Sequence, residues 1–240
     1  MKRLHTQVQG FTLIELLVVI SIIAILAGIA LPVFGEVQVR GQQTKALSNA
    51  KQIGTACKLY ALDYNGNFPA YTDLSAKTAA ASGASSNDIL QTLIPDYVPD
   101  KGIFSIPKSA FCKNAGSATA TAGTNAAKLG SAENEWAYLC GLSDTSNSRY
   151  PLLADGFSPG GTKYVATETA PGGIWKGKKA IVIRVDISGN VETLNKKDKS
   201  VKRNPDEPDA TAKDAFIAGP SDDPPWWDGT QVFVSNPTTN

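Results

Sequence analysis

The sequence predicts an α+β protein in which one long amino-terminal helix packs, through its second half, on a small antiparallel β-sheet. Three observations lead to this prediction. An apolar run opens the chain, an apolar stripe at helical spacing follows it, and short apolar segments bounded by turn-forming residues fill the carboxy-terminal half. The same pattern divides the 240 residues into the segments 1–10, 11–31, 32–66, 67–194 and 195–240.

Residues 11–31 form an apolar run, which as a helix would span about 30 Å, the thickness of the hydrocarbon core of a bilayer. A secretory signal peptide is the alternative, but its apolar region is shorter and ends at a small-x-small cleavage site. Here the run ends at Leu31-Pro32 without such a site. We therefore predict a single-pass anchor, with the short basic segment before it in the cytoplasm and the remaining chain outside.

Glu15 is a carboxylate inside this membrane-length run. Such a charge costs about 2.5–3.5 kcal/mol at the centre of a membrane helix, even on the gentler scales. A compensating positive charge is therefore expected close to it.

The stretch GFTLIELL, Gly10–Leu17, follows a short basic leader and resembles the prepilin-peptidase signature of type IV pilins and type II secretion pseudopilins. The resemblance implies a prepilin peptidase that cuts between Gly10 and Phe11 on the cytoplasmic side. It also implies that the new amine of Phe11 is methylated, that the leader 1–10 is lost and that the apolar helix is retained.

Cleavage would create a cationic amine at Phe11, and Glu15 of a neighbouring subunit can neutralise it. Two charges tolerate a low dielectric much better when they are paired. In the family this contact sets the register of subunits during filament assembly. Pro32 also matches a family position, where the helix kinks and can melt locally, because a helix-interior proline removes a backbone hydrogen bond.

The helix is expected to continue to about Asn65-Gly66, where glycine suits a left-handed helix end. Its polar stretch Gly35–Lys45 has left the membrane and is expected to flex. An apolar stripe at helical spacing then faces the globular domain. It comprises Ala46, Leu47, Ala50, Ile53, Cys57, Tyr60, Ala61 and Tyr64.

The segment Lys51–Pro69 resembles a helix end that is common in pseudopilin-like proteins. In it, Asp63, Asn65 and Asn67 alternate as in the first half of a calcium loop, but the acidic ligand expected downstream is missing. A metal site here and a plain capping turn therefore both remain open.

In the globular segment we predict surface loops at 72–86 and 114–134, and a short helix capped by Asn87 that ends near Ile94. Strands are predicted at 135–142 and 149–157. A hairpin is predicted at 179–194, with its turn at the sequence SGN. This hairpin resembles the carboxy-terminal strand-turn-strand of the same pseudopilin-like proteins, which favours a secretion pseudopilin over an adhesive pilus.

The tail, 195–240, combines a basic stretch with a proline-rich acidic one. It predicts either a solvated extension or complementary charge between adjacent subunits. Its apolar part, Pro224–Val234, is expected to dock as an extra strand or to cover a groove.

Cys112 and Cys140 flank the second loop, and the chain beyond the anchor would lie in an oxidising space. We predict a disulfide between them, which by the chain-entropy model would contribute about 3–4 kcal/mol. Cys57 lies on the apolar stripe and is expected to be a buried free thiol, although its pairing with either of the others stays open.

Enzymatic function is not expected. His5 is the sole histidine and lies in the leader, so the processed chain would have no histidine for catalytic triads or metal sites. The stretch Gly172–Lys179 matches most of a phosphate-binding loop, but it lacks the final Ser/Thr and a strand follows it. We predict no cofactor, and Trp136 and Trp175 are expected to be core aromatics. With 23 basic and 22 acidic residues, no nucleic-acid partner is expected.

The sequence thus predicts a structural subunit of a type IV pilus-like or type II secretion pseudopilus filament. The expected partners are copies of itself, the prepilin peptidase, the inner-membrane assembly machinery and, before assembly, the lipid bilayer. The chain is expected in the cytoplasmic membrane first, and then in a periplasmic or extracellular filament. The alternative is a membrane-anchored extracytoplasmic binding module that does not polymerise.

Overall fold

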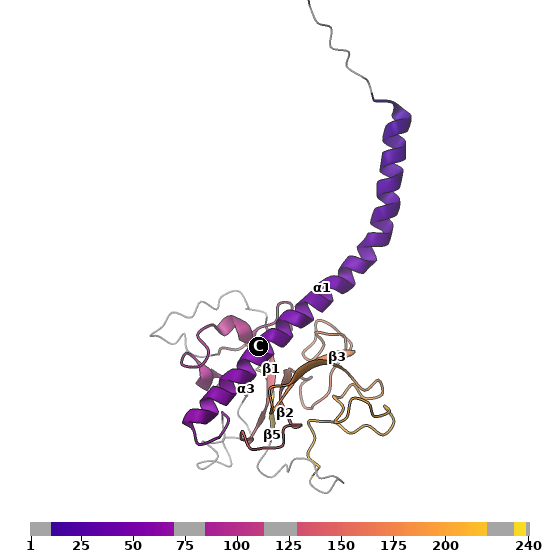
Figure 1. The fold of residues 1–240 in the computed structure, drawn as a ribbon. Coiled ribbons are helices and arrows are strands. Elements are labelled where there is room, and N and C mark those ends of the chain that lie inside the picture. The colour runs from indigo at the N-terminus through magenta and orange to yellow at the C-terminus, as the bar shows by residue number, and fades with distance from the viewer. Residues whose placement is uncertain (1–10, 70–84, 113–128, 220–232, 239–240) are drawn as a thin grey trace, which may run out of the picture. The chain divides into compact units, whose positions relative to one another are not determined.

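A computed structural model of the chain describes residues 11–69, 85–112, 129–219 and 233–238. Its long helix and its five-stranded antiparallel sheet confirm the predicted α+β class (Figure 1). The elements in chain order are α1 (Leu13–Asp63), α3 (Ser86–Leu90), the 3-10 helices η2 (Gln91–Leu93) and η3 (Lys101–Phe104), and the strands β1 (Trp136–Cys140), β2 (Pro151–Asp155), β3 (Lys179–Arg184), β4 (Gly189–Thr193) and β5 (Phe233–Ser235).

The chain divides into two compact units, residues 1–44 and 45–240, and α1 contributes to both. In the first unit α1 continues without a break through residue 32 and through the stretch 35–44. The polar stretch that was expected to flex is therefore helical here. The side chain of Pro32 lies outside the described residues, and the expected kink stays a prediction.

In the second unit, the end of α1 contributes the predicted stripe to the core. Six of its eight predicted residues are buried: Ala46, Ala50, Ile53, Cys57, Tyr60 and Ala61. Leu47 is partly buried, and Ala56, which was not predicted, is buried as well. Tyr64, predicted to belong to the stripe, is instead 40% exposed, and its ring stacks on Tyr60 with centroids 4.0 Å apart. The stripe ends there because the helix ends at Asp63.

The end of α1 is a left-handed turn. Asn65 and Gly66 have φ angles of 54° and 83°, and the Gly66 N–H donates to the carbonyl of Ala61 at 2.7 Å. This bond satisfies a carbonyl that the helix leaves without a partner, as in a Schellman motif. The predicted helix end is confirmed.

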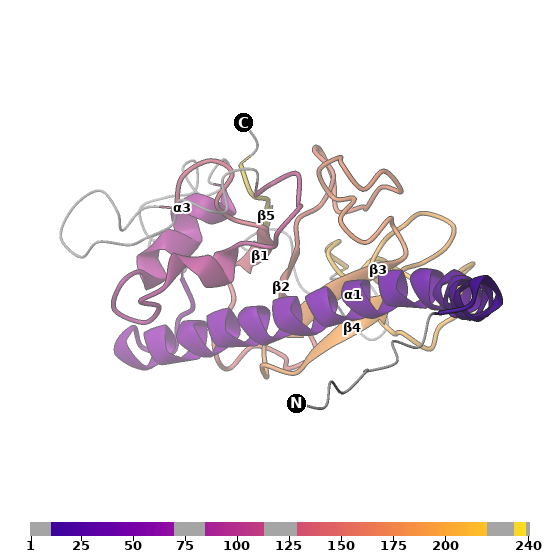
Figure 2. The same ribbon diagram turned by 90° about the horizontal axis from the view of Figure 1, so that it is seen from above.

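The sheet has the order β4-β3-β2-β1-β5, with every neighbouring pair antiparallel. α1 crosses it beside β3 and β4 (Figure 2). The three inner strands, β1, β2 and β3, are buried over most of their length. The rings of Phe157, Tyr164 and Phe216 form an aromatic cluster in the same core. Trp136 and Trp175 are both buried, which confirms that they are core aromatics.

The contact between α1 and the hairpin is close because both partners carry glycine there. A Cβ added at Gly54 would lie 3.1 Å from Ile183 Cγ2 and 3.3 Å from Ile187 Cδ1. A Cβ added at Gly189 would lie 3.1 Å from Lys51 Cε, on α1, and 2.3 Å from Ile183 Cδ1. Any larger side chain would push the helix away from the sheet.

Two local predictions were wrong. The short helix is capped by Ser85, not by Asn87, because Ser85 and Asp88 exchange hydrogen bonds in a capping box. Asn87 instead donates to the carbonyl of Gly130 at 2.7 Å. The β3–β4 turn comprises residues 185–188, with Ile187 at φ 64°, so only Ser188 of the SGN sequence belongs to the turn and the other two residues lie in β4.

The expectation of a solvated tail is wrong for residues 195–219. Val201, Ala215 and Phe216 are buried there, and Lys202 pairs with Asp209 at 2.7 Å within the same chain. Further along, β5 pairs with β1, which agrees with an extra strand for the last two residues of the predicted segment Pro224–Val234. The rest of that segment, 224–232, lies outside the described residues. The side chain of Asn236 then exchanges two 3.0 Å hydrogen bonds with the backbone of Phe157.

Replacing Gly54 with leucine is expected to destabilise the second unit by about 1–3 kcal/mol, because the side chain has no room against Ile183. The measurement is denaturant unfolding of the full chain in detergent, followed by tryptophan fluorescence. Gly41→Leu is the matched control, since a Cβ there meets nothing within 4 Å. Equal midpoints for the two variants would contradict the close contact.

Candidate functional site: the amino-terminal helix start

The first turn of α1 is closed by a capping box between Thr12 and Glu15. The backbone N–H of Thr12 donates to Glu15 Oε2 at 2.9 Å, and its hydroxyl donates to the same oxygen at 2.5 Å. In return the Glu15 N–H donates to Thr12 Oγ1 at 3.3 Å. The carboxylate is thus held at the helix amino terminus, where the partial positive charge of the helix dipole favours an anion.

The helix beyond this box has apolar side chains on every face. All large apolar residues between Leu13 and Leu31 are exposed, with Leu13 at 81% and Ile29 at 68%. This is the one helix in the described part of the chain that is long and apolar enough to cross a membrane. The hydroxyl of Ser21 donates to the carbonyl of Leu17 at 2.8 Å, so its polar group is satisfied within the helix.

Two of the predicted processing and assembly residues, Phe11 and Glu15, lie at this helix start. Phe11 is 76% exposed and directly precedes Thr12, while Gly10 lies outside the described residues. The sequence reading missed the role of Thr12. The pattern Thr-x-x-Glu ahead of an apolar run was the signal that would have revealed it.

The amino-terminal segment of the chain is similar to segments of known proteins. Residues 6–31 match the family model of the prokaryotic N-terminal methylation motif. The chain is similar to the type IV major pilin protein PilA of Myxococcus xanthus, with 47% identity over 24% of this chain and 26% of that protein. It is also similar to the type IV major fimbrial protein FimA of Dichelobacter nodosus, with 39% identity over 33% of this chain and 52% of that protein.

Through its amino-terminal segment, the chain is similar to type IV pilins. A third relative, the type IV major pilin protein PilE1 of Neisseria gonorrhoeae, is 31% identical over 42% of this chain and 52% of its own length. The chain thus spans about a quarter to a half of the length of these curated relatives. No solved structure matches it significantly.

The predicted disulfide of this pilin-like protein is absent: Cys57, Cys112 and Cys140 are all free and buried. The Cys112 thiol lies 3.9 Å from a carboxylate oxygen of Glu135, and the Cys140 thiol lies 4.0 Å from the Tyr138 carbonyl. Each thiol thus has a polar neighbour of its own. Burial raises the pKa of the Cys57 thiol to about 12, and it raises the pKa of the other two thiols as well.

The possible metal ligand Asp63 accepts a hydrogen bond from the Tyr97 hydroxyl at 2.6 Å. Within residues 11–69, 85–112, 129–219 and 233–238, no group of three His, Cys, Asp or Glu side chains is arranged to hold a metal ion.

Two buried carboxyl groups lie beside each other in the core. Burial raises the pKa of Glu135 well above its ordinary range, and the Ser109 hydroxyl donates to this side chain. Burial also raises the pKa of Asp155 to about 7, although its Oδ1 accepts the Ile181 N–H at 2.6 Å. The nearby Cys112 thiol stays protonated, so this cluster lacks an activated nucleophile.

The raised pKa of Asp155 predicts a pH-dependent stability. Below about pH 4 the carboxyl is neutral in both states, and between about pH 4 and 7 only the unfolded chain ionises. The free energy of unfolding should therefore fall as the pH rises through this window, by about 2–4 kcal/mol from Asp155.

In Asp155→Asn the amide oxygen can still accept the Ile181 N–H, but the group no longer titrates. We expect a shallower fall between pH 4 and 7, measured by urea unfolding of the full chain in detergent at several pH values. The slope left in the variant is attributed to Glu135, Glu192 and Asp214, because burial raises the pKa of each of these carboxyl groups. An unchanged slope would contradict the buried, protonated state of Asp155.

Proposed function

We propose that this chain is the structural subunit of a type IV pilus-like filament, cut between Gly10 and Phe11 and polymerised through the first half of α1. The observation that carries the proposal is the helix start. A fixed carboxylate, Glu15, stands at the head of a helix whose large apolar side chains from Leu13 to Leu31 are all exposed. Such a surface requires lipid or other helices around it.

The cut leaves the Thr12–Glu15 capping box intact, because both residues lie after it. The backbone N–H and the hydroxyl of Thr12 both donate to Glu15 Oε2, so the Glu15 carboxylate is held at a defined position on the helix. The methylated amine of Phe11 on a neighbouring subunit would pair with it. In an apolar surrounding each charge is destabilising unless the opposite charge lies beside it. Only one register between subunits brings the Phe11 amine beside Glu15, so this contact selects that register.

Before assembly the helix would hold the subunit in the cytoplasmic membrane, with residues beyond the anchor outside the cytoplasm. The partners would be the prepilin peptidase, the membrane assembly machinery and further copies of the chain. The filament would then stand in the periplasm or outside the cell. The proteins named above as relatives are pilus subunits, which favours a pilus over a secretion pseudopilus.

A membrane-tethered binding module that does not polymerise is the second candidate. It would need the apolar helix only as an anchor, and a carboxylate at its start would serve only to cap the first turn. In the polymer the same carboxylate has a second role as the partner of a neighbouring amine, and that role favours the polymer.

Two substitutions at position 15 separate capping from ion pairing. Glu15→Gln keeps an oxygen that can accept from Thr12 but has no charge, whereas Glu15→Ala removes both functions. We expect both variants to lose filaments, by about tenfold or more, while their soluble units unfold like the wild type. Electron microscopy of sheared material checks this result. Wild-type filament numbers in Glu15→Gln would refute the ion pair, and normal numbers in both would favour the tethered module.

The processed amino terminus can be read directly. Mass spectrometry of the exported protein is expected to show a chain that begins at Phe11 and carries one added methyl group. Gly10→Val should block the cut, because the peptidase signature requires glycine before the cleaved bond, and filaments should disappear with it. An intact Met1 in the exported wild-type protein would contradict the proposal.

A further inference from the structure

The carboxy-terminal end of α1 carries two neighbouring carboxylates. Asp63 accepts the Tyr97 hydroxyl at 2.6 Å, and Asp96 directly precedes Tyr97 in the chain. Both aspartates are exposed, and their negative charge contributes to raising the pKa of Tyr97 to about 12. This end of the globular unit is therefore negatively charged at neutral pH.

Large apolar side chains surround these carboxylates and are open to solvent. Leu62 is 78% exposed, Leu59 is 47% exposed and Tyr64 is 40% exposed. We define the helix-end surface as Leu59, Leu62, Asp63, Tyr64, Asp96 and Tyr97. The nearest basic residue of α1 is Lys58, whose Nζ lies 5.2 Å from the centroid of the Phe68 ring, so its charge is already engaged.

Four lysines gather where β3 begins and β4 ends. Lys179 is paired in register with Thr193, and the Leu194 N–H donates to the Lys178 carbonyl at 3.1 Å. The chain then continues directly into Lys196 and Lys197. We call these four residues the basic corner; none of them takes part in a salt bridge within the described residues.

The acidic residues near the basic corner are already paired. Glu192 binds Arg184 at 2.6 Å, Asp198 lies 3.8 Å from Lys163, and Asp209 binds Lys202 at 2.7 Å. Asp209 also interacts electrostatically with Lys196, so the uncompensated positive charge of the corner lies on Lys178, Lys179 and Lys197. Lysines in this state attract an acidic partner surface.

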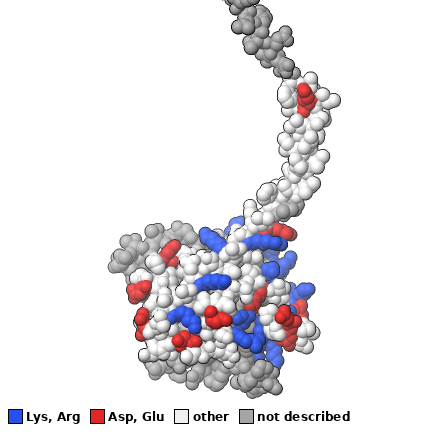
Figure 3. Space-filling model, in the orientation of Figure 1, with Lys and Arg blue, Asp and Glu red and all other residues white. Residues whose placement is uncertain are grey.

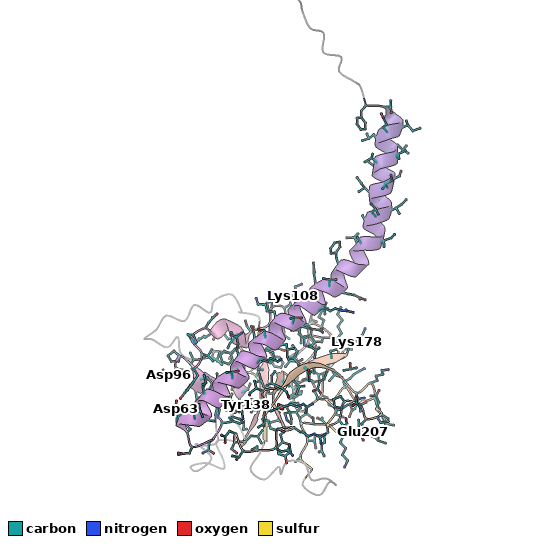
Figure 4. The ribbon with its side chains drawn as sticks, in the orientation of Figure 1. Asp63, Asp96, Lys108, Tyr138, Lys178 and Glu207 are labelled. Atoms are coloured by element: carbon teal, nitrogen blue, oxygen red, sulfur yellow. The ribbon has the colours of Figure 1, made fainter. Side chains whose placement is uncertain are left out.

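The two surfaces lie on opposite sides of the globular unit. Figure 4 places Asp63 and Asp96 at one edge and Lys178 at the other, and Figure 3 shows acidic side chains along the first edge. They cannot meet within one copy. A contact between different surfaces of identical subunits is head-to-tail, and repeated it builds a helical polymer.

We propose that the basic corner of one copy docks on the helix-end surface of a neighbouring copy in the filament. This inference rests on the proposed function. The lysine ammonium groups face Asp63 and Asp96 and lie over the tyrosine rings, while their alkyl stems cover the exposed leucines. The contact adds a second, salt-sensitive interface to the one between the apolar helices.

Charge reversal tests the contact in the full chain. Asp96→Lys, and separately the double variant Lys178→Glu and Lys179→Glu, are each expected to lower filament recovery in 150 mM salt about tenfold. Combining all three changes restores opposite charges and should recover most of the loss. Lys108→Glu is the matched control, because this exposed lysine lies in neither surface.

A zero-length carbodiimide cross-link on sheared wild-type filaments gives a second readout. Mixed isotope-labelled and unlabelled subunits are expected to yield inter-chain peptides that join the basic corner to Asp63 or Asp96. Normal filaments from the reversed variants, or wild-type filaments without such peptides, would overturn this contact and leave the proposed function standing. If wild-type chains form no filament, the proposed function fails and the contact fails with it.

Discussion

Two glycines set the distance between α1 and the sheet, and the globular unit depends on that distance. Gly54 on the helix and Gly189 at the start of β4 leave room for Ile183 and for the stem of Lys51 to fill the gap. Because the side chains of α1 and the sheet interdigitate at this contact, the helix end cannot slide easily against the sheet.

The same helix has to satisfy two different surroundings. Residues 45–63 bury small and aromatic side chains against a sheet, whereas residues 13–31 expose leucine, isoleucine and valine on all sides. The first half is a surface that water does not stabilise, so a bilayer and a bundle of copies are its two natural environments. Thr12 and Glu15 place a fixed negative charge at its start, which in the proposed filament is the partner of a neighbouring amine.

The core also contains two buried carboxyl groups. Glu135 and Asp155 are buried beside each other, and each has one carboxyl oxygen without a hydrogen-bond partner. Burial raises the pKa of both groups, so their contribution to the free energy of unfolding falls as the pH rises through the range in which the unfolded chain ionises. The three free cysteines belong to the same core, and the unit is stabilised by packing and hydrogen bonds without the predicted cross-link.

The sequence alone determined the features that follow from local periodicity and from short-range chemistry. The extent of α1, its left-handed end at Asn65-Gly66, the strands β1 to β3 and the processing signature around Phe11 are all encoded within a few neighbouring residues. Only the tertiary structure decided the rest, because these features depend on residues far apart in the chain. The amide of Asn87 donates to the carbonyl of Gly130, so Asn87 does not cap the short helix. The thiol of Cys112 lies beside Glu135 and not beside Cys140. The charged tail packs on the same unit, where Lys202 pairs with Asp209. The opposite placement of the helix-end surface and the basic corner is likewise a property of the folded unit, since no periodicity in the sequence relates Asp96 to Lys178.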